Sequence, residues 1–193
     1  YAEALSRKAG DATLGKAQYG VCAACHGQNG EGLQALNAPK IAGQSEWYLR
    51  NQIKSYQNGF RGVHEDDTYG KQMAPMANTL SSDEAIDNVI AHIQTFPDNP
   101  APKTVEGNVA NGERLYRVCA YCHGADGAGI QATNAPRMAG MTDWYLVRQL
   151  QNFKNDVRGS HVSDFYGMQM GFMGRMLADD QAINDLVAYI NTL

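Results

Sequence analysis

The motif Cys-x-x-Cys-His occurs twice in this 193-residue sequence and contains all four cysteines of the chain. The two copies are Cys22, Cys25 and His26, and Cys119, Cys122 and His123. Two thiols at this spacing can attach one porphyrin through its two vinyl groups, and the adjacent histidine can supply an axial nitrogen to its iron. The motifs therefore predict two covalently bound c-type haems, with His26 and His123 as the proximal ligands.

Closely spaced cysteines also occur in other kinds of site. Two Cys-x-x-Cys pairs could form a four-cysteine zinc site, and one pair could be a disulfide or a thioredoxin-like redox centre. Zinc knuckles usually lack a histidine directly after the second cysteine in both copies. A thioredoxin-like pair follows a strand in a βαβ unit, and no alternating strand pattern precedes either motif. The double motif, each copy followed by a glycine-rich segment and a later methionine, favours haem attachment.

The composition of the chain narrows the class of protein further. The net charge is −4 without a basic run, so we expect no nucleic-acid partner. No apolar run approaches the roughly 18 residues of a membrane-spanning helix, so we expect membrane association only through partner proteins. Covalent haem attachment takes place outside the cytoplasm in bacteria, which predicts a periplasmic protein. The sequence starts at Tyr1 without a signal-peptide pattern, and we expect a mature chain whose leader peptide is missing.

An internal repeat places the two motifs in equivalent units. The halves align without a gap at a constant offset, as these pairs illustrate: Gly15 and Gly112, Tyr19 and Tyr116, Trp47 and Trp144, Gln52 and Gln149, Arg61 and Arg158, and Met73 and Met170. A single duplication indicates two tandem domains rather than a solenoid of many short repeats. We place the N-terminal domain at residues 1–96, a proline-rich and semi-rigid linker at residues 97–107, and the C-terminal domain at residues 108–193.

Each unit is predicted to be all-α, with three main helices. The first covers residues 11–24 and carries the cysteines at its end. The second follows Ser45 and stops at Asn58-Gly59, and the third starts with a capping box from Ser81 to Glu84. Residues 60–80 are expected to form a long loop, which we interpret as functional because such loops are uncommon in compact domains.

The second axial ligand of each iron is expected from this segment and its repeat. Three repeated pairs qualify: Met73 and Met170, Met76 and Met173, and His64 and His161. A thioether would raise the reduction potential relative to a second imidazole, because soft sulfur favours Fe(II). Methionine commonly fills apolar cores and a loop histidine can simply be solvated, so the residue types leave all three pairs open.

With these features the whole sequence resembles the cytochrome c4 family, which consists of two-haem proteins built from two class I cytochrome c domains. Besides the haem motifs, the similarity lies in Asn37-Ala-Pro39, Tyr48-Leu-x-x-Gln52 and Gln72-Met73 with their repeats. The resemblance implies that Met73 and Met170 are the distal ligands. It also implies that the carbonyls of Pro39 and Pro136 accept a hydrogen bond from the proximal histidine rings. The repeated Arg61-Gly-x-His64 stretch has no role in that pattern.

The resemblance implies electron transfer. A His/Met-ligated haem has no open position for a substrate, so we expect a carrier between periplasmic or membrane-bound redox partners, such as a cytochrome bc1-type donor and a terminal oxidase. The alternative is the haem subunit of a periplasmic oxidoreductase acting on thiosulfate, sulfide or peroxide. Such an enzyme needs one haem with an open position or an unusual ligand. Both units offer the same ligand candidates, which favours an electron carrier over an enzyme.

Overall fold

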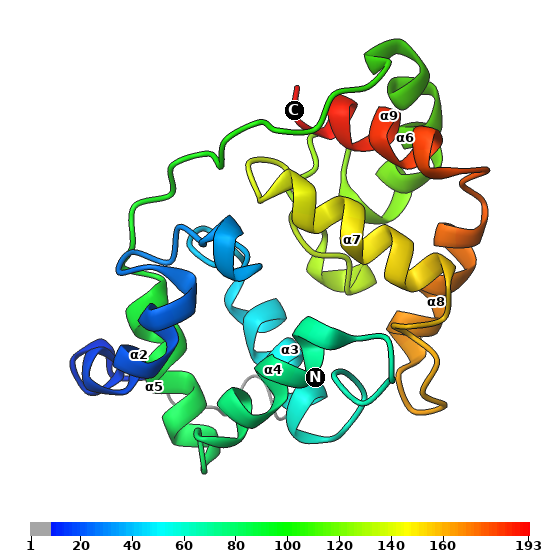
Figure 1. Ribbon diagram of the computed structural model, residues 1–193. Coiled ribbons are helices and arrows are strands. Elements are labelled where there is room, and N and C mark those ends of the chain that lie inside the picture. The colour runs from blue at the N-terminus through cyan, green and yellow to red at the C-terminus, as the bar shows by residue number, and fades with distance from the viewer. Residues whose placement is uncertain (1–8) are drawn as a thin grey trace.

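The computed structural model describes residues 9–193, and its regular structure in that range is helical (Figure 1). The N-terminal unit contains α2 (Ala12–His26), α3 (Glu46–Gln57), α4 (Thr68–Asn78) and α5 (Asp83–Ile93), with a 3-10 turn at Gln34–Leu36. The C-terminal unit contains α6 (Val109–His123), α7 (Asp143–Lys154), α8 (Phe165–Arg175) and α9 (Asp180–Ile190), with a 3-10 turn at Gln131–Thr133. The predicted all-α fold of two repeated units is confirmed. No helix within residues 9–193 has the length and apolar character needed to cross a membrane.

The first and last helices of each unit cross at a glycine. α2 packs against α5, and α6 packs against α9 (Figure 1). A Cβ atom on Gly15 would lie 1.9 Å from the backbone oxygen of Asn88, and one on Gly112 would lie 1.9 Å from that of Asp185. Only glycine allows the two backbones to approach so closely. The crossing fixes the direction of α2 and α6, whose C-terminal ends carry the cysteine motifs.

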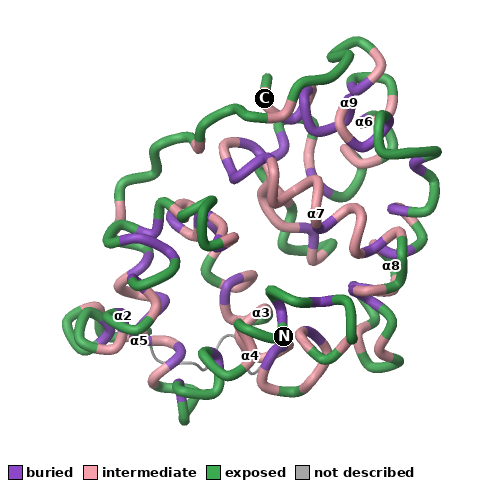
Figure 2. The backbone as a smooth tube through the Cα atoms, viewed as in Figure 1, coloured by how far each residue is buried: buried purple, intermediate pink, exposed green. Residues whose placement is uncertain are grey.

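Each unit buries its own apolar core beside this crossing. In the N-terminal unit Ile86 of α5 belongs to a buried cluster with Tyr19 of α2. In the C-terminal unit the equivalent residues, Ile183 and Tyr116, belong to a second cluster. Buried residues therefore concentrate on the helices, whereas the connection between the units is mostly exposed (Figure 2).

The expectation of a long loop over residues 60–80 is wrong, because α4 occupies much of this segment and α8 occupies its repeat. Each of these helices begins at an aspartate. Asp67 accepts a hydrogen bond from the Gly70 amide at 3.0 Å, and Asp164 accepts one from the Gly167 amide at 3.0 Å. Such a cap satisfies an amide that the helix leaves free, and it helps α4 to form despite an interior proline, Pro75.

The other helix starts lie close to their predicted positions. The cap of α5 is one residue later than the predicted box: Ser82 accepts a hydrogen bond from the Ala85 amide at 3.1 Å. α3 follows Ser45, as the sequence predicts, and α7 follows Thr142, the equivalent residue of the repeat. Neither side chain caps its helix. The side chain of Thr142 therefore remains available for another partner.

The segment between Ile93 and Val109 contains no helix and runs along the outside of the molecule (Figures 1 and 2). Its Ala101 amide donates to the Gly140 carbonyl at 3.0 Å. Its Asp98 forms ion pairs with both units, through Lys40 and through Arg137. The linker is therefore attached to the boundary between the units as well as connecting them.

Candidate functional site

Each cysteine motif occupies the last turns of the first helix of its unit. His26 ends α2 and His123 ends α6, and these residues are 8% and 5% exposed. In both motifs the first cysteine is half-buried and the second is exposed, and all four thiols are free. The Tyr19 hydroxyl donates to the Gly27 carbonyl at 2.8 Å, which ties the helix to the turn that follows it. The arrangement directs the imidazoles inward and keeps the thiols accessible for attachment.

The ring nitrogens of the proximal histidines face proline carbonyls. Nδ1 of His26 lies 2.8 Å from the Pro39 oxygen, and Nδ1 of His123 lies 2.9 Å from the Pro136 oxygen. Because Nδ1–H donates in this geometry, Nε2 keeps its lone pair for a metal. Burial lowers the pKa of both imidazoles, although the proline carbonyls act in the opposite direction. Burial thus favours the neutral imidazole in both units, which is the form that binds iron.

A glycine packs closely against the peptide group of each proline carbonyl. A Cβ atom on Gly32 would lie 2.4 Å from the Lys40 nitrogen, and one on Gly129 would lie 2.5 Å from the Arg137 nitrogen. Both glycines have φ angles that favour glycine, +84° and +83°. The glycine-rich segments after the cysteine motifs thus fix the acceptor that orients each proximal histidine.

A cavity of about 600 Å³ reaches both proximal histidines and is lined by residues of both units. Its lining includes His26 and His123 together with Met73 of α4 and Met170 of α8. Leu49, Val89, Leu146 and Leu150 are among the aliphatic side chains that complete it. Cys22 and Cys25 also line it, whereas Cys119 and Cys122 do not.

The other two pairs of possible distal ligands are placed differently. Met76 lines the cavity and is 39% exposed, whereas its repeat Met173 is not part of the lining. His64 and His161 do not line the cavity. Instead, Nδ1 of each ring accepts a hydrogen bond from a backbone amide two residues later, at 3.2 Å and 3.1 Å. Of the three repeated pairs, the pair Met73 and Met170 lines the cavity with the proximal histidines in both units.

Two buried arginines connect the units, and sequence reasoning did not assign them to the site. Arg61 donates to Gln52 of its own unit at 2.6 Å and to Gln149 of the other unit at 3.2 Å. Arg158 donates to Gln149 at 2.8 Å and to Gln52 at 2.8 Å. Each arginine also donates to a tyrosine hydroxyl of the other unit. Arg61 donates to Tyr145 at 3.1 Å, and Arg158 donates to Tyr48 at 3.2 Å. The repeated Arg-Gly-x-His stretch was the sequence signal that pointed to them.

This arginine network fits a group that carries carboxylates. Arg61 and Arg158 are 6% and 7% exposed, and both line the cavity. Nε of each is buried and has no hydrogen-bond partner among residues 9–193. A buried guanidinium needs a counter-charge, and its fork matches a carboxylate well. The residues present therefore fit a haem: thiols for attachment, imidazoles for the iron, and two arginines for propionates.

The family comparison defines the class of this protein. The family model described as Cytochrome c matches residues 12–97 and again residues 109–193. With one attachment motif in each matched segment, the chain is a dihaem c-type cytochrome.

Relatives and solved structures narrow the class. Cytochrome c4 of Thiocapsa roseopersicina is 32% identical over 99% of this chain and 97% of that protein. The thiosulfate dehydrogenase electron acceptor of Stutzerimonas stutzeri is 30% identical over 83% of this chain and 73% of that protein. The crystal structure of reduced recombinant cytochrome c4 from Pseudomonas stutzeri superimposes with a TM-score of 0.75 at 28% identity, covering 96% of this chain and 100% of that one. The chain belongs to the cytochrome c4 family.

Two covalently bound c-type haems are accordingly the cofactors of this chain, and its function is electron transfer with redox partners. A c-type haem carries one electron by alternating between Fe(III) and Fe(II). The protein residues hold it in place, keep water from the iron and set its potential.

Proposed function

We propose that this chain is an electron carrier in which His26 and Met73 bind one iron and His123 and Met170 bind the other. The observation that supports the proposal is that all four side chains line one cavity, with the methionines at equivalent positions on α4 and α8. A thioether opposite an imidazole completes six-coordination, so no position remains for a substrate. It also raises the reduction potential relative to a second histidine.

The carrier works in the periplasm between a cytochrome bc1-type donor and a terminal oxidase. The chain has a net charge of −4. An anionic carrier associates fastest with a partner that has a locally positive surface, and salt screens this attraction. The chain carries two haems, one in each unit. An electron can therefore enter at one unit and leave at the other.

A second function is favoured by one observation, the similarity to a thiosulfate dehydrogenase electron acceptor. In this alternative the chain takes electrons from a thiosulfate-oxidising enzyme as its haem-carrying partner or subunit. As an electron acceptor the chain needs no open haem position, unlike a subunit that itself acts on a substrate. The two functions therefore differ in the donor.

Stopped-flow kinetics on the holoprotein test both functions. We expect a solubilised terminal oxidase to reoxidise the reduced protein rapidly, at a rate that falls with ionic strength. The oxidised protein alone should not turn over thiosulfate, sulfide or peroxide, and the reduced protein should bind carbon monoxide only slowly. Rapid binding of carbon monoxide to one haem would contradict the proposed ligation and favour an enzyme. Reduction that requires both thiosulfate and a purified thiosulfate dehydrogenase would identify the alternative donor.

A further inference from the structure

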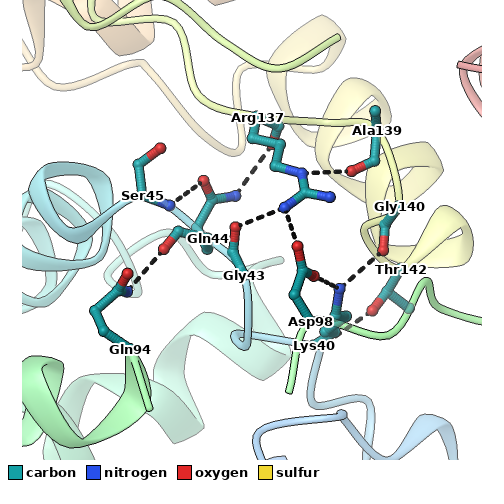
Figure 3. Close-up of polar contacts among 10 residues, drawn as sticks. All are labelled: Lys40, Gly43, Gln44, Ser45, Gln94, Asp98, Arg137, Ala139, Gly140 and Thr142. Atoms are coloured by element: carbon teal, nitrogen blue, oxygen red, sulfur yellow. Dashed lines mark hydrogen bonds and ion pairs between the residues drawn. The ribbon is translucent and has the colours of Figure 1, made fainter. Parts of the chain in front are cut away.

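A continuous hydrogen-bond path leads from the N-terminal haem site into the C-terminal unit. Nδ1 of His26 lies 2.8 Å from the Pro39 carbonyl oxygen. The same peptide group carries the Lys40 amide, which donates to Oγ1 of Thr142 at 2.8 Å (Figure 3). Lys40 and Thr142 are both buried, at 4% and 6% exposure. A side chain of one unit thus completes the hydrogen bonding of the peptide that orients the histidine of the other.

The C-terminal haem site lacks this connection. Nδ1 of His123 lies 2.9 Å from the Pro136 oxygen, and Arg137 occupies the place of Lys40. Ser45 is equivalent to Thr142, yet within residues 9–193 no hydrogen bond joins it to the Arg137 amide; its own amide donates to Gln44. Gln44 instead reaches the Arg137 carbonyl at 3.1 Å, which belongs to the next peptide (Figure 3). The two otherwise similar haem sites therefore differ in what their proline peptides contact.

Ionic contacts surround this path, and each unit contributes one cation to them. Lys40 Nζ donates to Asp98 at 2.7 Å and to the Gly140 carbonyl at 3.1 Å. Arg137 binds the same Asp98 carboxylate and donates to the Gly43 carbonyl at 3.0 Å (Figure 3). Each unit therefore has one cation at the equivalent position, and the two share one counter-charge. This cluster holds the two units together beside the contact between Thr142 and Lys40.

The effect of the Thr142 bond on the histidine has a definite direction. An acceptor at the Lys40 amide polarises the peptide and increases the negative charge on the Pro39 oxygen, because hydrogen bonds in a chain strengthen one another. A stronger acceptor at Nδ1 makes the imidazole a better electron donor at Nε2. A more strongly donating ligand stabilises Fe(III) over Fe(II).

We propose that Thr142 is a positioning residue of the C-terminal unit that lowers the reduction potential of the N-terminal haem, acting through the Lys40 amide and the Pro39 carbonyl on His26. The inference rests on the proposed role of His26 as an iron ligand, but not on Met73 or Met170. It makes the potential of the first haem depend on the packing of the second unit.

Potentiometric titration of the full-length holoprotein tests this, with the haems distinguished by NMR. In Thr142→Val we expect the N-terminal haem to shift to a higher potential while the C-terminal haem stays unchanged. Thr142→Ser retains an acceptor and should restore the parent potential. Ser45→Ala is the matched control and should change neither haem. If Thr142→Val loads haem poorly, Thr142→Ala gives the same comparison.

NMR of the reduced protein supplies a second readout. Loss of the bond should move the Lys40 amide and His26 Nδ1 proton signals upfield. If the Lys40 signal moves and the potential of the N-terminal haem does not, the inference is overturned. Equal shifts of both haems would also overturn it, because they would indicate a general loosening of the interface. A parent protein without methionine ligation would contradict the proposed function, whereas the expected effect of Thr142 would remain.

Discussion

Arg61 in the N-terminal unit donates a hydrogen bond to Gln149 in the C-terminal unit at 3.2 Å, and Arg158 returns the equivalent bond to Gln52 at 2.8 Å. The guanidinium groups also lie over equivalent rings, Arg61 at 4.5 Å from the Tyr56 centroid and Arg158 at 4.4 Å from that of Phe153. Such reciprocity is typical of a two-fold interface between identical subunits. The duplicated chain thus packs its halves in the way that a symmetric dimer does.

Removing one of these arginines is expected to destabilise the protein. Arg61→Leu leaves the buried oxygens of Gln52 and Gln149 with fewer donors, and we expect the free energy of unfolding to fall by about 2–3 kcal/mol. Guanidinium denaturation of the holoprotein measures the change. Arg114→Ala is the control, because Arg114 is exposed and donates to nearby Asn111 at 2.8 Å. Equal stability of the two variants would contradict a structural role for the interface.

The helix crossing predicts opposite effects for two glycines of α2. In Gly15→Ala the new methyl group would meet the Asn88 backbone oxygen at 1.9 Å, so the crossing must open. We expect a loss of at least about 1–3 kcal/mol, as for an overpacked core. Apart from its chain neighbours and the backbone of its own helix, no atom of residues 9–193 lies within 4 Å of a Cβ on Gly20, so Gly20→Ala should stabilise the helix by about 0.5–1 kcal/mol. Thermal unfolding distinguishes the two, and equal melting temperatures would refute the close approach.

The stability that the Asp143 carboxylate contributes is expected to be present above about pH 4 and to be lost as the pH falls below it. This carboxylate is fully buried and accepts hydrogen bonds from the Val105 amide at 2.8 Å and the Asn191 side chain at 3.0 Å, and also from Thr104. Burial alone would raise the pKa of Asp143, but the Thr104 and Val105 donors outweigh it and hold the pKa below its usual value. A lowered pKa adds stability above the unfolded-state value, and this stability is lost as the pH falls through the folded-state value.

The corresponding variant is Asp143→Asn. We expect it to be less stable than the parent at neutral pH, and we expect the difference to shrink as the pH falls below about 4. Asp156→Asn is the control, because Asp156 forms an exposed ion pair with Arg175. Unfolding measured across the pH range checks both variants. A difference between Asp143→Asn and the parent that stays constant down to pH 3 would show that the carboxylate is not stabilised by its donors.

Features that depend on neighbouring residues could be predicted from the sequence. The cysteine motifs and the second helix after Ser45 follow from local patterns, and the repeat follows from aligning the two halves of the sequence. The sequence does not indicate the helix over Thr68–Asn78, because Gly70 and Pro75 are poor helix formers. Asp67 caps this helix, but one possible cap does not outweigh two residues that disfavour helix.

Contacts between the units could not be predicted in the same way. The repeat makes Arg61 and Arg158 equivalent, but it does not indicate that each binds the glutamine of the other unit. Thr142 directly precedes α7 without capping it, and its hydroxyl accepts a hydrogen bond from the Lys40 amide of the other unit. Such contacts depend on how two folded units pack, which the local sequence does not encode.

The near-infrared spectrum of the oxidised holoprotein tests the proposed ligation most directly. Methionine ligation gives a weak sulfur-to-iron band, and we expect the parent protein to have it. Met73→Ala and Met170→Ala should each remove part of the band, and the double variant should remove all of it. Met76→Ala and Met173→Ala, the matched controls, should leave it intact. Absence of the band in the parent, or its loss in a control variant, would contradict ligation by Met73 and Met170.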